Sequence, residues 1–94
     1  MSGVTVVLPS QLRELAEGRA SVLLRGGPPT VGDALQALRE DYPAVYDRVV
    51  TERREVRPHV NLFVGREDIR WSGGLRTPLT DGSEVVILPS VSGG

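Results

Sequence analysis

Apolar and polar residues alternate in several short segments of the chain, which is the pattern of half-buried β-strands. In the first segment, residues 4–8, Val4, Val6 and Leu8 fall on one face. Residues 20–24 and 60–64 predict further strands. Residues 84–88 are almost continuously apolar, which is typical of a central strand covered on both faces. The pattern therefore predicts a small sheet, to which residues 69–71 add a brief pairing segment.

A helical period replaces this alternation after residue 30. One face of the predicted helix carries apolar residues at the required spacing, namely Val31, Ala34, Leu35 and Leu38. Thr30 and Asp33 resemble a capping box at its start, and Pro43 ends it and opens a second short helix over residues 43–50. Residues 11–17 predict a helical turn or a loop, and the charged residues 51–58 predict a solvated loop.

The order of these elements indicates an α+β fold. The first two strands are expected to form a hairpin, and the helix is expected to cross over the sheet in the right-handed sense. The last strand would return to the middle of a mixed sheet, beside the first, with one main helix packed on one face. We expect one domain over residues 1–89 and a flexible C-terminal tail over residues 90–94.

Composition excludes several classes of function. The chain has no cysteine, so a disulfide framework and a thiolate metal site are both unavailable. All eleven basic residues are arginine, and they interleave with acids to a net charge of −1, which argues against nucleic acid and anionic membrane as partners. No apolar run approaches the roughly 20 residues of a membrane-spanning helix, and no signal peptide is recognisable. A cytoplasmic location is expected.

The dipeptide Gly-Gly recurs at residues 26–27, 73–74 and 93–94. The first two pairs lie between predicted elements, where glycine serves tight turns. The third closes the sequence and has no following chain to turn. It supplies a slim peptide that can thread a narrow channel and present a free carboxylate. We therefore hypothesise that the α-carboxylate of Gly94 carries the chemistry of this protein.

Several segments together carry a resemblance to a known family. They are residues 4–6, 30–35, 60–64, 68–79 and 81–89, the last running on to Gly93 and Gly94. Over essentially its whole length the chain resembles the ubiquitin-like sulfur carriers of the ThiS/MoaD type, which have the β-grasp fold. Residues 68–75, Asp-x-Arg-x-Ser-Gly-Gly-Leu, look most like the CysO-type carriers of cysteine biosynthesis. Ser92 departs from the pattern, because many relatives have alanine there.

The resemblance implies a carrier rather than an enzyme. An E1-like adenylating enzyme of the ThiF/MoeB type would consume ATP to activate Gly94, and a sulfur donor or sulfurtransferase would convert it to a thiocarboxylate. Val91, Ser92 and Gly93 would thread the partner's active site. The carrier itself would need no catalytic residue, metal or bound cofactor. The expected acceptor is a PLP-dependent cysteine synthase.

Other functions of the same tail stay open. The chain could be the small subunit of molybdopterin synthase, held by the large subunit in molybdenum cofactor biosynthesis. It could also be a ubiquitin-like modifier that forms isopeptide bonds to lysines of other proteins.

Partner contact requires an apolar patch and steering charges near the tail. The candidates are Leu62, Phe63, Arg70, Leu75 and Arg76. Trp71 is expected in the core or partly buried, with a partner-facing position as the less favoured alternative.

Overall fold

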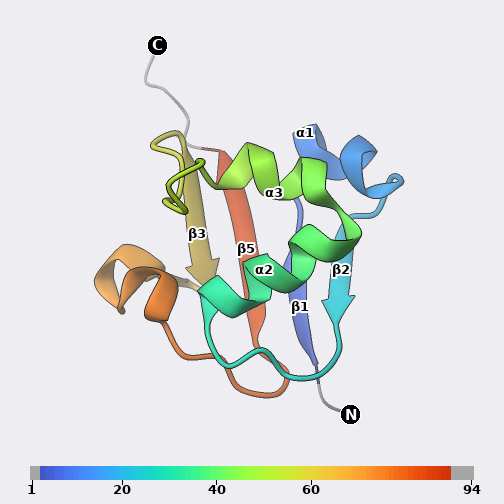
Figure 1. Cartoon of the computed structure of the whole chain (residues 1–94). Coiled ribbons are helices and arrows are strands. Elements are labelled where there is room, and N and C mark those ends of the chain that lie inside the picture. The colour runs from blue at the N-terminus through green and yellow to red at the C-terminus, as the bar shows by residue number, and fades with distance from the viewer. Residues whose placement is uncertain (1–2, 90–94) are drawn as a thin grey trace.

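The computed structural model describes residues 3–89 (Figure 1). Its elements in chain order are β1 (Val4–Val7), α1 (Ser10–Arg13), η1 (Glu14–Ala16), β2 (Ser21–Leu24), α2 (Val31–Asp41), α3 (Pro43–Val49), β3 (Val60–Val64), β4 (Glu67–Asp68), η2 (Ile69–Trp71), η3 (Gly74–Arg76) and β5 (Glu84–Pro89). The η elements are single 3₁₀ turns.

The sheet has the order β2-β1-β5-β3-β4. β1 runs parallel to β5, and the other neighbours are antiparallel. β5, the last strand along the chain, therefore lies at the centre beside the first, as expected. The mixed sheet with its main helix on one face confirms the predicted β-grasp fold (Figure 1).

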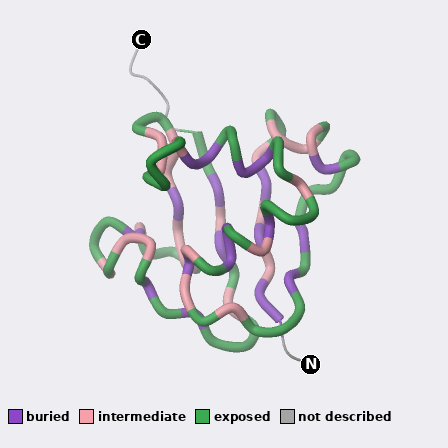
Figure 2. The backbone as a smooth tube through the Cα atoms, viewed as in Figure 1, coloured by how far each residue is buried: buried purple, intermediate pink, exposed green. Residues whose placement is uncertain are grey.

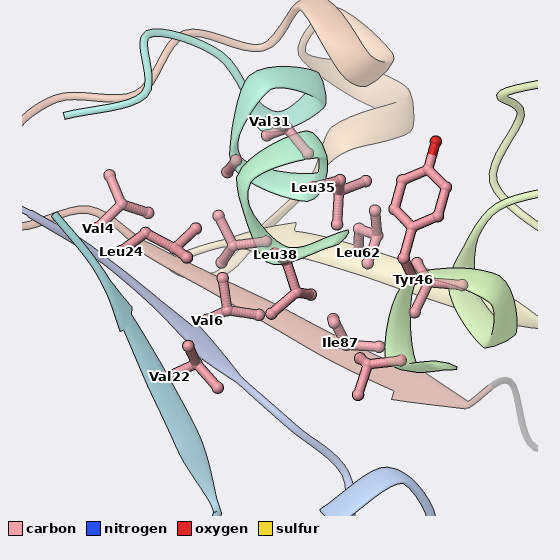
Figure 3. Packing of buried hydrophobic residues seen from close by; sticks show 14 of the residues in the cluster. Val4, Val6, Val22, Leu24, Val31, Leu35, Leu38, Tyr46, Leu62 and Ile87 are labelled. Carbon is pink, nitrogen blue, oxygen red and sulfur yellow. The ribbon is translucent and has the colours of Figure 1, made fainter. Parts of the chain in front are cut away.

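Helix α2 forms where the capping signal and the apolar stripe coincide. The hydroxyl oxygen of Thr30 accepts a hydrogen bond from the backbone N–H of Asp33, which satisfies a donor that the helix itself cannot pair. The predicted stripe, Val31, Ala34, Leu35 and Leu38, is buried. Figure 3 shows its side chains pointing onto those of Val6, Leu62 and Ile87 from the sheet, where they form the core.

Within residues 3–89, helices cover only one face of the sheet (Figure 1). Val85 and Ile87 of β5 are buried, whereas Leu88 is exposed and Val86 is only partly buried (Figure 2). The prediction that β5 is covered on both faces is therefore wrong. A continuously apolar strand is typical of a doubly covered position, but here half of its side chains face the side without helices.

The chain around residues 67–71 also differs from the expected strand. Glu67 and Asp68 pair with β3, and Ile69–Trp71 turns into a 3₁₀ helix. The carboxylate of Asp68 accepts a hydrogen bond from the backbone N–H of Arg70 and so caps that turn, which ends the pairing. Glycines 26, 27, 73 and 74 all have positive φ, which confirms the first two Gly-Gly pairs as turn glycines.

Candidate functional site

The last strand fixes the position of Pro89, which precedes the predicted tail. β1 and β3 pair with the two edges of β5, and its inward side chains are buried. At its end, Pro89 lies opposite Val60 of β3. β1 pairs with β5 as far as Val86 and β3 pairs with it as far as Pro89, so β5 cannot slide without breaking both ladders. The predicted site residues Val91, Ser92, Gly93 and Gly94 lie outside the described residues.

A row of apolar side chains lies beside this anchor, on the sheet face without helices. The register places Val7 next to Val86 and Val86 next to Phe63, and paired residues point to the same face. Leu88 shares that face and is 43% exposed. We call Val7, Phe63, Val86 and Leu88 the open-face patch. It offers apolar contact area next to the base of the tail, and it includes the predicted contact residue Phe63.

Arg70 is held close to this patch by a fixed set of hydrogen bonds. Its guanidinium pairs with the Asp68 carboxylate at 2.7 Å and donates to the side-chain oxygen of Asn61 at 3.2 Å. Asn61 lies opposite Leu88 in the sheet. The side-chain hydrogen bond from Arg70, followed by the bond from its backbone N–H, lowers the pKa of Asp68. The ion pair therefore stays charged at neutral pH and orients Arg70 at the border of the open-face patch.

Leu62 does not belong to a partner surface. It is 1% exposed and packs under α2, one residue away from Phe63 on the opposite face of β3. Both residues are apolar, so alternation alone could not identify which one faces the helix. Leu62 is removed from the contact candidates for this reason.

Leu75 and Arg76 lie apart from the open-face patch, on η3 beside the start of α2. Leu75 is partly buried against the core, and a Cβ on Gly32 would lie only 3.2 Å from its carbonyl oxygen. Arg76 is exposed. Three of the five predicted contact residues, Leu62, Arg70 and Leu75, line one surface hollow with Val60, which lies opposite Pro89. Phe63 lies on the sheet face without helices, and Arg76 is exposed on η3.

Besides Leu88, two large exposed apolar side chains were not among the predicted contacts. Trp71 is 81% exposed, so its expected place in or near the core is wrong, and the less favoured exposed position is the observed one. The tight turn capped by Asp68 points the indole outward. Leu23 on β2 is 52% exposed. The Asp-x-Arg spacing before Trp71 is the signal that could have identified the turn, because a side-chain cap favours a local turn over a strand.

Within residues 3–89, no three His, Asp or Glu side chains gather closely enough to hold a metal ion. No helix in that part of the chain is long and apolar enough to cross a membrane.

Comparisons with known proteins agree with this architecture. The model of the ThiS family matches residues 6–94. Sulfur carrier protein CysO of Mycobacterium tuberculosis is 39% identical over 93 residues, which cover 97% of this chain and 98% of that protein. Small archaeal modifier protein 1 of Haloferax volcanii is 34% identical over 85 residues, which cover 90% of this chain and 93% of that protein.

A solved structure supports the same relation. The CysO of Amycolatopsis orientalis, crystallised in complex with BexX, superposes with a TM-score of 0.86 at 35% identity. The alignment covers 97% of this chain and 99% of that one. Because the family match includes nearly every residue, the chain belongs to the ThiS family.

Proposed function

We propose that this protein is a sulfur carrier that works through the carboxylate of Gly94. One observation carries the proposal: the chain is similar to CysO sulfur carriers over nearly the full length of both proteins. The absence of cysteine agrees with it, because no side-chain thiol is available to hold sulfur. The family match also extends through Gly94.

The chemistry starts with activation, since a carboxylate is a poor electrophile. In the partner enzyme, an oxygen of the Gly94 carboxylate attacks the α-phosphorus of ATP, and pyrophosphate leaves. A sulfur nucleophile, such as sulfide or a donor's persulfide, then attacks the acyl carbon and displaces AMP. With sulfide the product is the thiocarboxylate directly, and with a persulfide a thiol must then cleave the S–S bond. Glycine adds no side-chain bulk at the reacting carbon, and the resulting thioacid is a soft nucleophile.

The folded domain is the part of the protein that the partner enzyme would bind during this reaction. Pro89 is anchored opposite Val60, so a partner that holds the domain also fixes the base of the tail. The open-face patch, with Arg70 at its border, includes Leu88, the residue before Pro89, and so offers a contact surface next to that base. We propose that this surface docks the adenylating enzyme while Val91, Ser92 and Gly93 thread its active site.

For sulfur delivery, the similarity to CysO favours cysteine biosynthesis. The acceptor would be a PLP-dependent cysteine synthase, which would take sulfur from the thiocarboxylate. A molybdopterin synthase would instead hold the carrier in a stable complex with its large subunit. Purification of the tagged protein from its native host separates these two pathways, because only the second predicts a stoichiometric large subunit.

Similarity to small archaeal modifier protein 1 supports a second candidate function, covalent attachment to other proteins. The activated Gly94 would then form an isopeptide bond with a lysine of a target. This protein has no lysine, so its own side chains could not receive such a bond. Mass spectrometry of trypsin-digested proteins from cells with and without the gene would detect a C-terminal remnant of this chain on target lysines.

The direct test uses the intact chain, the cognate adenylating enzyme, ATP and a sulfur donor. The expected result is a mass increase equal to the replacement of one oxygen by one sulfur, located on Gly94 by fragmentation. Deleting Gly94, or adding one residue after it, should abolish the increase while the thermal melting curve stays unchanged. A wild-type chain that acquires no sulfur, with an enzyme active on another carrier, overturns the proposal.

A further inference from the structure

The charged loop after α3 is an ordered structure. Val50 and Val56 form a β-bridge across its base, and the backbone N–H of Thr51 donates to the carbonyl oxygen of Glu55 at 2.8 Å. At its tip, Arg54 has a φ of 63°, and its N–H donates to the carbonyl oxygen of Thr51 at 2.9 Å. A left-handed conformation is uncommon for arginine and carries a strain cost, which the surrounding hydrogen bonds must offset.

The loop, α2 and α3 surround a surface hollow of about 540 Å³ that contains three arginines. The guanidinium of Arg39 lies 5.4 Å from the centre of the Tyr46 ring. The Nε–H of Arg57 donates to the main-chain oxygen of Asp47 at 2.8 Å. Arg54 reaches the hollow from the tip of the loop. The side chains of Arg39 and Arg57 are therefore each held by a local contact.

None of these three arginines forms an ion pair within 4.0 Å in the described chain. Across residues 3–89, the one ion pair is that between Arg70 and Asp68. Asp47 and Glu52 also line the hollow, but their carboxylates are more than 4.0 Å from the arginine nitrogens. A guanidinium presents a fork of donors that matches a carboxylate, so the hollow can accept acidic groups from outside.

The hollow continues into an apolar one. A second depression, of about 190 Å³, shares Tyr46, Val50 and Arg54 with the first and extends over Leu35 to Leu75. The combined groove has three arginines at one end, and at the other it has the apolar side chains of Leu35 and Leu75 with Asp33 beside them. The hydroxyl of Tyr46 accepts a hydrogen bond from Gln36, which fixes the ring between the two parts. Figure 3 shows this hydroxyl pointing away from the core.

We infer that this groove docks an extended peptide segment of the adenylating enzyme, with apolar side chains at one end and carboxylates at the other. A compact polyanion such as a phosphate fits less well, because it would leave the apolar part of the groove, over Leu35 and Leu75, uncovered. An extended segment can place its carboxylates beside Arg39, Arg54 and Arg57 and its apolar residues over Leu75. Charge complementarity of this kind steers association and fixes the register of an interface.

The position of the groove suits such a partner. The backbone N–H of Val60 donates to the carbonyl oxygen of Arg57 at 3.0 Å, and Val60 lies opposite Pro89. The basic end is thus tied to the strand that anchors the base of the tail, and Figure 1 shows the loop at the same end of the sheet. An enzyme that binds both the groove and the open-face patch would contact the domain on two sides. This inference rests on the proposed function, since it names a contact of the enzyme that activates Gly94.

The test measures ATP–pyrophosphate exchange by the adenylating enzyme as a function of carrier concentration. The variant is the double change Arg39→Glu and Arg54→Glu, and the matched control is Arg19→Glu and Arg66→Glu, two exposed arginines that do not line the groove. Both variants change the net charge equally. We expect the KM for the carrier to rise about tenfold in the groove variant with kcat unchanged, and to change by less than about twofold in the control.

Several results would overturn the inference. One is an equal rise of KM in both variants, which would indicate only a general effect of charge, and another is no rise in either. A third is a saturable shift of the Arg39, Arg54 and Arg57 side-chain NMR signals on titration with sodium pyrophosphate, with KM unaffected by the substitutions, because that result indicates a small-anion site. A wild-type chain that supports no exchange contradicts the proposed function itself, and this outcome is visible before any variant is made.

Discussion

Leu35 is one of the large, fully buried residues whose truncation should cost much stability. It is 1% exposed and lies at the centre of the α2 stripe, between the helix and the sheet. Leu35→Ala removes buried methyl groups and leaves a cavity, so the free energy of unfolding should fall by about 2–5 kcal/mol. Leu88→Ala, at an exposed position in β5, should cost less than about 1 kcal/mol. Urea denaturation of both variants measures the difference, and equal losses would contradict the assigned core.

The ion pair of Asp68 and Arg70 gives the folded chain a specific pH dependence. The pKa of Asp68 is lowered in the folded protein, chiefly by the side-chain hydrogen bond from Arg70. Its contribution to stability is therefore complete above the unfolded pKa of about 3.8 and is lost as pH falls through the lower folded value.

The variant Asp68→Asn isolates this charge while it keeps an oxygen that can cap η2. Wild type should exceed the variant in stability by a constant amount from neutral pH down to about pH 4, and the difference should shrink below that. Denaturation curves of both proteins at several pH values measure this difference in unfolding free energy. A difference that grows on acidification would contradict the assigned pair.

At the scale of elements, helix α2 depends on its cap. Thr30 accepts from the N–H of Asp33, and its hydroxyl donates to the Asp33 carboxylate at 2.7 Å. Thr30→Ala should lower the unfolding free energy by about 1 kcal/mol. Thr30→Ser should retain most of the stability that the cap contributes, because the hydroxyl remains. Thermal and denaturant unfolding of the pair provide the measurement. A serine variant as unstable as the alanine variant would show that the methyl group of Thr30, rather than its hydroxyl, matters.

The elements also mark what could be predicted from the sequence and what could not. Helix α2 was predictable because a hydroxyl cap and an apolar stripe point to the same segment. The turn at 69–71 was harder to predict, because its one signal in the sequence, the side-chain cap from Asp68, competes with strand pairing. The hairpin-like order within residues 50–56 was hidden for a similar reason: its hydrogen bonds are made by backbone groups, which leave no pattern in the side chains.

At the scale of the whole molecule, the sheet order was predictable and the surfaces were not. The long apolar run at residues 84–88 correctly indicated a central strand. The same run could not reveal that one face of the sheet carries no helix, since that depends on where the other elements pack. The open-face patch and the arginine groove both come from residues far apart in sequence. Of the candidate site, the sequence indicated Gly94 and its tail, whereas the surroundings of Pro89 required the fold.

The central position of β5 has a consequence for folding during synthesis. The β2-β1 and β3-β4 pairs are joined in the sheet only through β5. On the ribosome, both hairpins emerge before residues 84–89 and have no common sheet until this strand arrives, so the core closes late. If the adenylating enzyme of the proposed function recognises the folded surface, it would not bind incomplete or truncated chains. Completion of folding would then be required before ATP is consumed.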